Sequence, residues 1–399
     1  MRRLRVNALE RAKKAATESI DRLAGSLWSL SLEIHRDPEP SFQEHRACRR
    51  LCAFLEGQGF EVRRGVGRLP TAFQARRAAR RGRPAVSFLS EYDALPGLGH
   101  ACGHNVIGVA SAGAGAALAQ AVGPEAGAVV VTGTPAEEKG GGKVLLARRG
   151  LFRGLDAVMM FHPSGETRAE VNFLALAELR FRFTGRAAHA SASPEKGINA
   201  LDAVLAAFQA IAALRQHIPP GDRVHGIVTE GGEAPNIIPA RASAWFYVRS
   251  TTPEGLKSLA GRVEACARGA ARATGARLRI WRNPVSYAPM RVNGALAALF
   301  RENLRCLGVR EPEPLPPLAM GSSDVGNVSQ VTPTIHPQIQ MVPGGVSAHT
   351  PAFARAAGGA AGRKALLLGA KALAMTGADI LLDAKARSRV RAEFERGGR

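Results

Sequence analysis

The sequence predicts an α/β protein with a central mixed sheet flanked by helices, interrupted by a smaller inserted α+β domain. At 399 residues the chain is too long for one compact core, so two domains are expected. Short apolar runs alternate with helical segments in the first part, as in an α/β sheet. The middle part instead has the order β-α-β-β-α-β of a ferredoxin-like domain. We therefore expect residues 1–176 and 288–399 to form the larger domain and residues 177–287 the inserted one.

The first part of the larger domain is expected to alternate between helices and strands. Helices are predicted over 8–36, 41–57 and 106–121, and strands over 85–89, 128–132 and 157–161. Each of these strands is a short, almost uninterrupted apolar run, as in a sheet that is covered on both faces. Ligands of such sheets gather beyond the carboxyl ends of the strands. The polar residues that follow each strand are therefore the first candidates for a site.

The inserted domain is expected to contain four strands and two helices. The strands are predicted over 178–184, 223–229, 242–249 and 277–281, and the helices over 197–217 and 254–274. The α/β character resumes near Val292, and a helix over 362–376 lies close to the end of the chain.

The charge of the chain is strongly positive. Lys and Arg number 54 against 33 Asp and Glu, a formal net charge of +21, which attracts anions of many kinds. Aromatic residues make up only 5% and do not alternate with the basic residues as a base-stacking surface requires. We expect no nucleic acid partner. The excess of arginine is attributed to the base composition of the gene, with an acidic substrate as the alternative.

Neither a membrane anchor nor a disulfide framework is expected. We find no run of about twenty apolar residues, the length that spans a bilayer. The basic start, 1–14, lacks the apolar segment and cleavage site of a secretory signal. The five cysteines are odd in number and scattered, and Cys48 and Cys52 are expected to be buried apolar residues of a helix. The expected location is the cytoplasm.

The strongest motif follows the strand over 85–89. Asp93-Ala-Leu-Pro precedes His100-Ala-Cys102-Gly-His104-Asn105. Two histidines and a cysteine within five residues, in a glycine-rich loop at a strand end, are typical of a metal site. Imidazole and thiolate both favour zinc or a similar ion.

Further ligand candidates follow the next two strands. Glu137 and Glu138 are adjacent carboxylates, so one can bind a metal while the other moves protons, and their like charges favour a nearby cation. His162 follows the third strand, and His349 lies far downstream. The stretch 140–143 lacks the Ser or Thr and the strand-to-helix position of a phosphate loop, and we discard that interpretation.

These residues together suffice for a two-metal site. The predicted ligands are Cys102, His104, Glu138, His162 and His349. A deprotonated Cys102 is the natural bridge between the two ions. Glu137 is then left as the general base, which takes a proton from the attacking water and returns it to the leaving nitrogen.

These motifs, in this order, resemble the co-catalytic metallohydrolases that include aminoacylase, hippurate hydrolase and aminobenzoyl-glutamate hydrolase. The resemblance runs from about Leu30 to Leu382. It is closest to the branch that contains one of the aminobenzoyl-glutamate hydrolase subunits and the β-alanyl-lysine dipeptidase-like proteins. The segments that carry it are 91–96, 100–105, 133–138, 321–329 and 372–376. The resemblance implies a zinc-peptidase-like catalytic domain, an inserted domain that serves as lid and dimer interface, and a homodimer.

The resemblance also implies residue roles. It supports the same five ligands and Glu137 as base, with Asp93 and His100 behind the ligands. His189, in Gly-Arg-Ala-Ala-His-Ala, would reach the partner subunit's site and polarise the scissile carbonyl. Asn236 would help to hold the substrate, and Arg249 would bind its carboxylate.

The resemblance therefore implies a metallo-dipeptidase or amidohydrolase that cleaves the amide bond of a small dipeptide or N-acyl amino acid. Its cofactors would be two divalent ions, zinc first, with manganese or cobalt as alternatives. Dipeptides with β-alanyl or γ-aminobutyryl groups and aminobenzoyl-glutamate-type substrates both stay open. A protein that keeps the fold but only binds partners through its basic surface is a further alternative.

Overall fold

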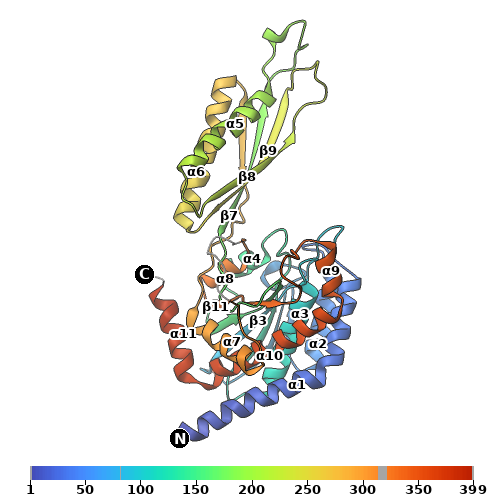
Figure 1. Ribbon diagram of the computed structural model, residues 1–399, viewed down its shortest axis with the longest axis vertical. Coiled ribbons are helices and arrows are strands. Elements are labelled where there is room, and N and C mark those ends of the chain that lie inside the picture. Colours follow the sequence, from blue (N-terminus) through green and yellow to red (C-terminus); the bar gives the residue numbers. More distant parts are fainter. Residues whose placement is uncertain (1, 81, 313–320, 398–399) are drawn as a thin grey trace. The chain divides into compact units, whose positions relative to one another are not determined.

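The computed structural model describes residues 2–80, 82–312 and 321–397 and divides the chain into two units (Figure 1). Unit 1 comprises Met1–Asn172, Met290–Pro316 and Ser323–Arg399. Unit 2 comprises Phe173–Pro289 and Pro317–Ser322. The smaller unit is thus inserted into the sequence of the larger one.

The central sheet of unit 1 is mixed, as predicted. Its strands, in spatial order, are β1 (Glu61–Arg64), β2 (Phe73–Arg77), β4 (Ala128–Gly133), β3 (Ala85–Ser90), β5 (Ala157–Met159) and β11 (Thr334–Ile335). The four from β4 to β11 are parallel, whereas β2 runs antiparallel to both β4 and β1. Every residue of β3 and β4 is buried, which explains why these strands are continuous apolar runs. A separate parallel pair joins β6 (His162–Ser164) to β12 (Gln338–Gln340).

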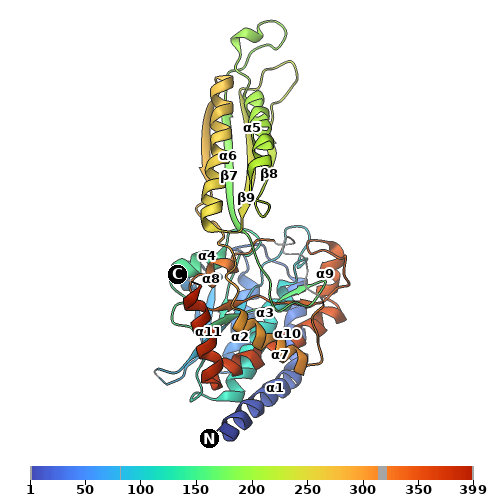
Figure 2. The same ribbon diagram turned by 60° about the vertical axis from the view of Figure 1, so that its left-hand side comes forward.

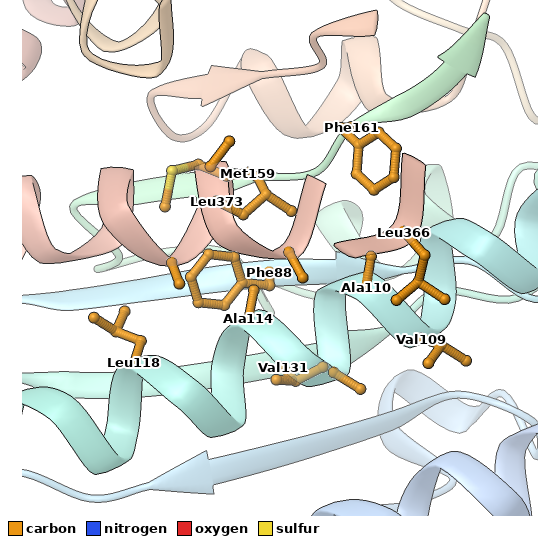
Figure 3. Close-up of a cluster of buried hydrophobic side chains, with 14 of the residues drawn as sticks. Phe88, Val109, Ala110, Ala114, Leu118, Val131, Met159, Phe161, Leu366 and Leu373 are labelled. Atoms are coloured by element: carbon orange, nitrogen blue, oxygen red, sulfur yellow. The ribbon is translucent and has the colours of Figure 1, made fainter. Parts of the chain in front are cut away.

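Three long helices build the core on the sheet. α3 (His104–Val122) and α10 (Ala360–Leu382) pack against each other and against β3, and α1 (Arg2–Arg36) packs against both helices. Figure 3 shows Phe88 of β3 between side chains of α3 and of α10. Small residues in α3 permit this approach: a Cβ on Gly113 would lie only 2.9 Å from the Leu27 side chain of α1.

Two of these core helices correct one expectation. α3 and α10 are each long and apolar enough to cross a membrane, although the sequence was expected to contain no such segment. Most of each helix is buried inside unit 1, as is typical of the core helix of a globular domain. Both helices are rich in alanine and glycine, which are only weakly hydrophobic. The apolar character of these segments is therefore hard to recognise in the sequence.

Shorter helices complete unit 1. They are α2 (His45–Gly57), α4 (Gly142–Arg148), α7 (Gly294–Cys306), α8 (Val325–Ser329), α9 (Pro351–Ala357) and α11 (Ala384–Arg396). Cys48 and Cys52 lie buried in α2 as free cysteines whose sulfurs are in contact at 4.0 Å, as expected for two core residues.

Unit 2 has the predicted ferredoxin-like topology. Its elements, in chain order, are β7 (Ala175–Thr184), α5 (Ala200–Leu214), β8 (Arg223–Glu230), β9 (Arg241–Ser250), α6 (Pro253–Thr274) and β10 (Arg277–Arg282). They form an antiparallel sheet in the order β10-β7-β9-β8, with both helices on one face (Figure 2). Alternate residues of β9 are buried beneath these helices, which is the period-2 pattern of a sheet covered on one face.

Candidate metal centre

The polar motifs meet at one edge of the unit 1 sheet. Asp93 follows the carboxyl end of β3, and the Glu137–Glu138 pair follows the carboxyl end of β4. His162 begins β6, directly after β5. Because these three strands are parallel neighbours, their carboxyl ends lie side by side and bring the three motifs together.

The predicted ligands and Glu137 form overlapping groups. Within the described residues, three groups have ligand atoms that all lie within 4.8 Å of one another. These are Cys102 with His104 and His162, Cys102 with Glu138 and His349, and His104 with Glu137 and Glu138. Cys102, His104 and Glu138 each belong to two groups, and of these three Cys102 offers a sulfur, which could be shared by two ions.

His162 is arranged to offer a neutral imidazole nitrogen. Its Nδ1 lies 2.7 Å from the Pro163 carbonyl oxygen, to which it donates, and its Nε2 lies 3.3 Å from Cys102 Sγ. Burial lowers the pKa of His162 to about 4, so the ring is uncharged at neutral pH. A donating Nδ1 leaves the lone pair on Nε2, the form that binds a metal.

Asp93 orients His104, as its position behind the ligands predicts. The Nδ1 of His104 lies 2.9 Å from the Asp93 carbonyl oxygen and 3.0 Å from its Oδ1. The other carboxylate oxygen of Asp93 accepts bonds from Ser41 Oγ and from the Glu138 amide. Burial lowers the pKa of His104, but Asp93 and Cys102 both raise it, and the net pKa lies well above its ordinary value. The surrounding negative charges thus favour a cation on the Nε2 side of His104, which can be either a proton or a metal ion.

Glu138 and His349 approach each other from distant parts of the sequence. His349 Nε2 lies 3.4 Å from Glu138 Oε2, and the His349 side chain is about half exposed. The His349 backbone has a φ of 64°, and its amide donates to the Ala101 carbonyl. This left-handed conformation is unfavourable for a residue with a side chain, so the surrounding contacts must hold it.

The donor set fits divalent metal ions. Two buried atoms, His104 Nε2 and Glu138 Oε1, have no hydrogen-bond partner in the described part of the chain. Burial raises the pKa of the Cys102 thiol, and the charges of Glu138 and Glu137 add to this, although His104 lowers it. Burial followed by the charges of Glu91 and Asp324 likewise raises the pKa of Glu137 well above its usual range. A bound cation would satisfy the two buried atoms that have no hydrogen-bond partner. It would also offset the repulsion between the neighbouring negative carboxylates.

A buried ion cluster beside the site was missed from the sequence. Lys143 is fully buried, and its Nζ lies 2.6 Å from Glu91 Oε1 and 2.7 Å from Asp324 Oδ1. The second oxygen of Glu91 lies 3.5 Å from His104 Nε2. In the sequence, the stretch that contains Lys143 is only a failed match to a phosphate loop. A lysine at the start of a short apolar helix was the signal that could have identified it.

His100 lies outside the candidate ligand groups. It is buried, its Nε2 lies 3.1 Å from the Ile34 carbonyl oxygen, and its ring stacks with His35 at 6.1 Å. Burial lowers the pKa of His100 to about 3, so it is neutral. The geometry accords with a role in packing the loop that carries Cys102.

Two of the three substrate-handling candidates in unit 2 lie close together. His189 forms a bridge with Ile237, and the Ala190 amide donates to the Asn236 carbonyl. The His189 side chain is fixed by amides that donate to its Nδ1, which leaves Nε2 to carry the proton. Asn236 precedes β9, whereas Arg249 lies near its opposite end. The Arg249 guanidinium donates to Ser322 Oγ at 2.7 Å.

The chain is similar to several known hydrolases. Residues 175–274 match the family described as the peptidase dimerisation domain. The Xaa-Arg dipeptidase of Mus musculus is 40% identical over 97% of this chain and 93% of its own length. One of the p-aminobenzoyl-glutamate hydrolase subunits of Escherichia coli K12 is 35% identical over 60% of this chain and 54% of its own. A Bacillus subtilis structure, described as a dinuclear metal binding peptidase from the M20 family, has a TM-score of 0.69 at 20% identity, covering 90% of this chain and 99% of its own.

Proposed function

Since the chain belongs to the M20 peptidase family, we propose that it hydrolyses the amide bond of a small dipeptide with a basic carboxyl-terminal residue. The family and the hydrolase class predicted from the motifs are thereby confirmed. The dipeptide is favoured because the mouse relative, which aligns with nearly the whole chain, is named for that activity. An aminobenzoyl-glutamate-type substrate is the second candidate, since the Escherichia coli relative aligns over a smaller part.

The observation that supports this function most strongly is that all five predicted ligands lie in overlapping groups, which are linked through Cys102, His104 and Glu138. Cys102, His104, Glu138, His162 and His349 would hold two divalent ions. Sulfur and imidazole ligands favour zinc, with manganese and cobalt as alternatives. When bound, such ions acidify a water molecule and polarise the scissile carbonyl.

The protein's own residues supply the proton transfers and the orientation of the substrate. Glu137 takes the proton of the attacking water and delivers it to the leaving nitrogen. His189, with Nδ1 fixed by backbone amides, presents Nε2–H as a donor to the scissile carbonyl oxygen of a substrate in the partner subunit's site. Asn236 holds the substrate, and Arg249 binds its carboxylate, an anion common to every candidate substrate.

We also propose a homodimer that forms through unit 2. Strand β8 lies at the edge of its sheet, and Ile227 and Val228 on this strand are exposed. An apolar edge strand is a natural surface for pairing with another chain. A cytoplasmic location is proposed because all five cysteines, each in the described part of the chain, are unpaired.

The test combines metal analysis with a substrate panel. The purified protein is expected to contain about two metal ions per chain and to cleave one class among arginine dipeptides, β-alanyl-lysine, aminobenzoyl-glutamate and hippurate. Metal-stripped protein and Glu137→Gln serve as controls, and both should lack turnover. A Glu137→Gln variant that hydrolyses as fast as the wild type would refute the assigned mechanism. Protein without metal or turnover would favour the binding-protein alternative.

A further inference from the structure

The segment from Gly321 to Ser329 carries part of the family resemblance, but none of its residues is among the proposed metal ligands, base or substrate-binding residues. The structure brings one of its side chains to the proposed general base. Ser323 is buried, and its Oγ donates a hydrogen bond of 2.8 Å to Glu137 Oε1. This bond joins residues that are 186 positions apart in the sequence, so it arises only through the fold.

Ser323 is held firmly by its neighbours. Its carbonyl accepts the Gly326 amide at 3.2 Å, and the Val325 amide approaches its Oγ at 3.5 Å, at the start of α8. The next residue, Asp324, accepts both the backbone amide of Lys143 at 2.9 Å and its Nζ at 2.7 Å. Adjacent residues of one segment therefore hold both ends of the loop from Glu137 to Lys143.

The backbone of Glu137 is fixed from another direction. Ala136, which precedes it, has a φ of 60°, and its amide donates to Glu44 Oε1 at 2.8 Å. The left-handed conformation at Ala136 turns the chain out of β4 and sets the direction in which Glu137 leaves the backbone. Glu44 thus acts on the main chain, whereas Ser323 acts on the carboxylate itself.

We propose that Ser323 is a positioning residue for the general base. By donating to Oε1, the hydroxyl fixes the rotamer of the Glu137 carboxylate, which takes the proton from water. A misplaced base lowers the rate of proton transfer without changing how tightly the substrate binds. The inference rests on the proposed function, because it needs Glu137 to act as a base.

The experiment compares four variants of the full-length protein. Ser323→Ala removes the hydroxyl, Ser323→Thr keeps it, and Glu137→Gln removes the base. Ser111→Ala is the matched control, because Ser111 is also a buried serine of unit 1, whose hydroxyl donates to the Leu89 carbonyl in the core. Metal content, thermal midpoint, kcat and KM are measured for each.

Ser323→Ala is expected to lower kcat by about 10- to 100-fold, with KM within about threefold of the wild type. Its metal content should stay unchanged, and Ser323→Thr should recover most of the lost kcat. Ser111→Ala should keep the wild-type kcat. If Ser323→Thr does not fold, the split between kcat and KM in Ser323→Ala, set against Ser111→Ala, decides the question.

Three results would overturn the inference. One is a Ser323→Ala enzyme with wild-type kcat while Glu137→Gln is inactive, which would leave the proposed function intact. Another is an equal loss of kcat in Ser111→Ala, which would indicate a general structural effect. A loss of bound metal in Ser323→Ala would assign the residue to the stability of the metal centre instead. A wild-type protein that cleaves no substrate of the panel would count against the proposed function itself.

Discussion

Replacing Lys143 by methionine is expected to destabilise unit 1 severely. Its ammonium group is fully buried between Glu91 Oε1 at 2.6 Å and Asp324 Oδ1 at 2.7 Å. Methionine has nearly the volume of the lysine stem, so the packing changes little. The charge is lost, however, and two buried carboxylates then face each other with no cation between them.

The magnitude follows from the desolvation of those carboxylates. Burial lowers the pKa of Lys143, but the charges of Asp324 and Glu91 outweigh burial, and the net pKa lies above its ordinary value. The lysine is therefore charged at neutral pH. Removing one partner of a buried ion pair costs about 3–5 kcal/mol, because the remaining charges stay shielded from water and lose the cation that neutralised them. We expect the free energy of unfolding of unit 1 to fall by this amount.

Urea unfolding of the metal-free protein measures the effect. The chain has three tryptophans, Trp28 in α1 of unit 1 and Trp245 and Trp281 in unit 2. In a background with Trp245→Phe and Trp281→Phe, the fluorescence of Trp28 reports on unit 1 alone. A loss of about 3–5 kcal/mol corresponds to a fall in the urea midpoint of about 1–2 M.

The matched control is Lys14→Met in α1. Lys14 is about four-fifths exposed and lies 3.9 Å from Glu18, so its loss should change the free energy by less than about 0.5 kcal/mol. If Lys143→Met lowers the free energy of unfolding by less than about 1 kcal/mol, the buried ion cluster is not the stabilising element that its geometry implies.

Three further predictions concern the metal centre, the inserted domain and pH. Cys102→Ser should lower metal content to below about one ion per chain, whereas exposed Cys306→Ser should keep about two; equal contents by mass spectrometry would exclude a bridging sulfur. His189→Ala should abolish turnover with metal unchanged, and loss of metal would mean that its role is misassigned. Burial, then Asp93, raises the pKa of Glu44 to about 7, so the folded state holds a proton that the unfolded chain releases. The contribution of Glu44 to the free energy of unfolding is therefore fully present below about pH 4.5. It falls by up to about 3 kcal/mol as the pH rises through about 7. Glu44→Gln should flatten this decline in urea titrations, and an unchanged slope would contradict the shift.

The sequence predicted elements best where burial imposes a regular pattern. The strand over 128–132 and the helix over 254–274 match β4 and α6 to within one residue. β1 and β2 were not predicted, because Glu-Val-Arg-Arg and Phe-Gln-Ala-Arg-Arg carry charges along an exposed part of the sheet. Their strand conformation depends on pairing with β4 through β2, and no local pattern reports that pairing.

The sequence by itself determined which residues could carry the chemistry. Sulfur, imidazole and carboxylate groups at successive strand ends predicted a metal site, because parallel strands must present these ends at one edge. Only the tertiary structure brought His349 to Glu138 and placed Cys102 in two ligand groups. It alone revealed the charged Lys143 in the interior and the bond from Ser323 to Glu137. A buried charge or hydroxyl is tolerated only where a partner meets it, and partners 181 and 186 positions away are supplied by the fold and not by local sequence.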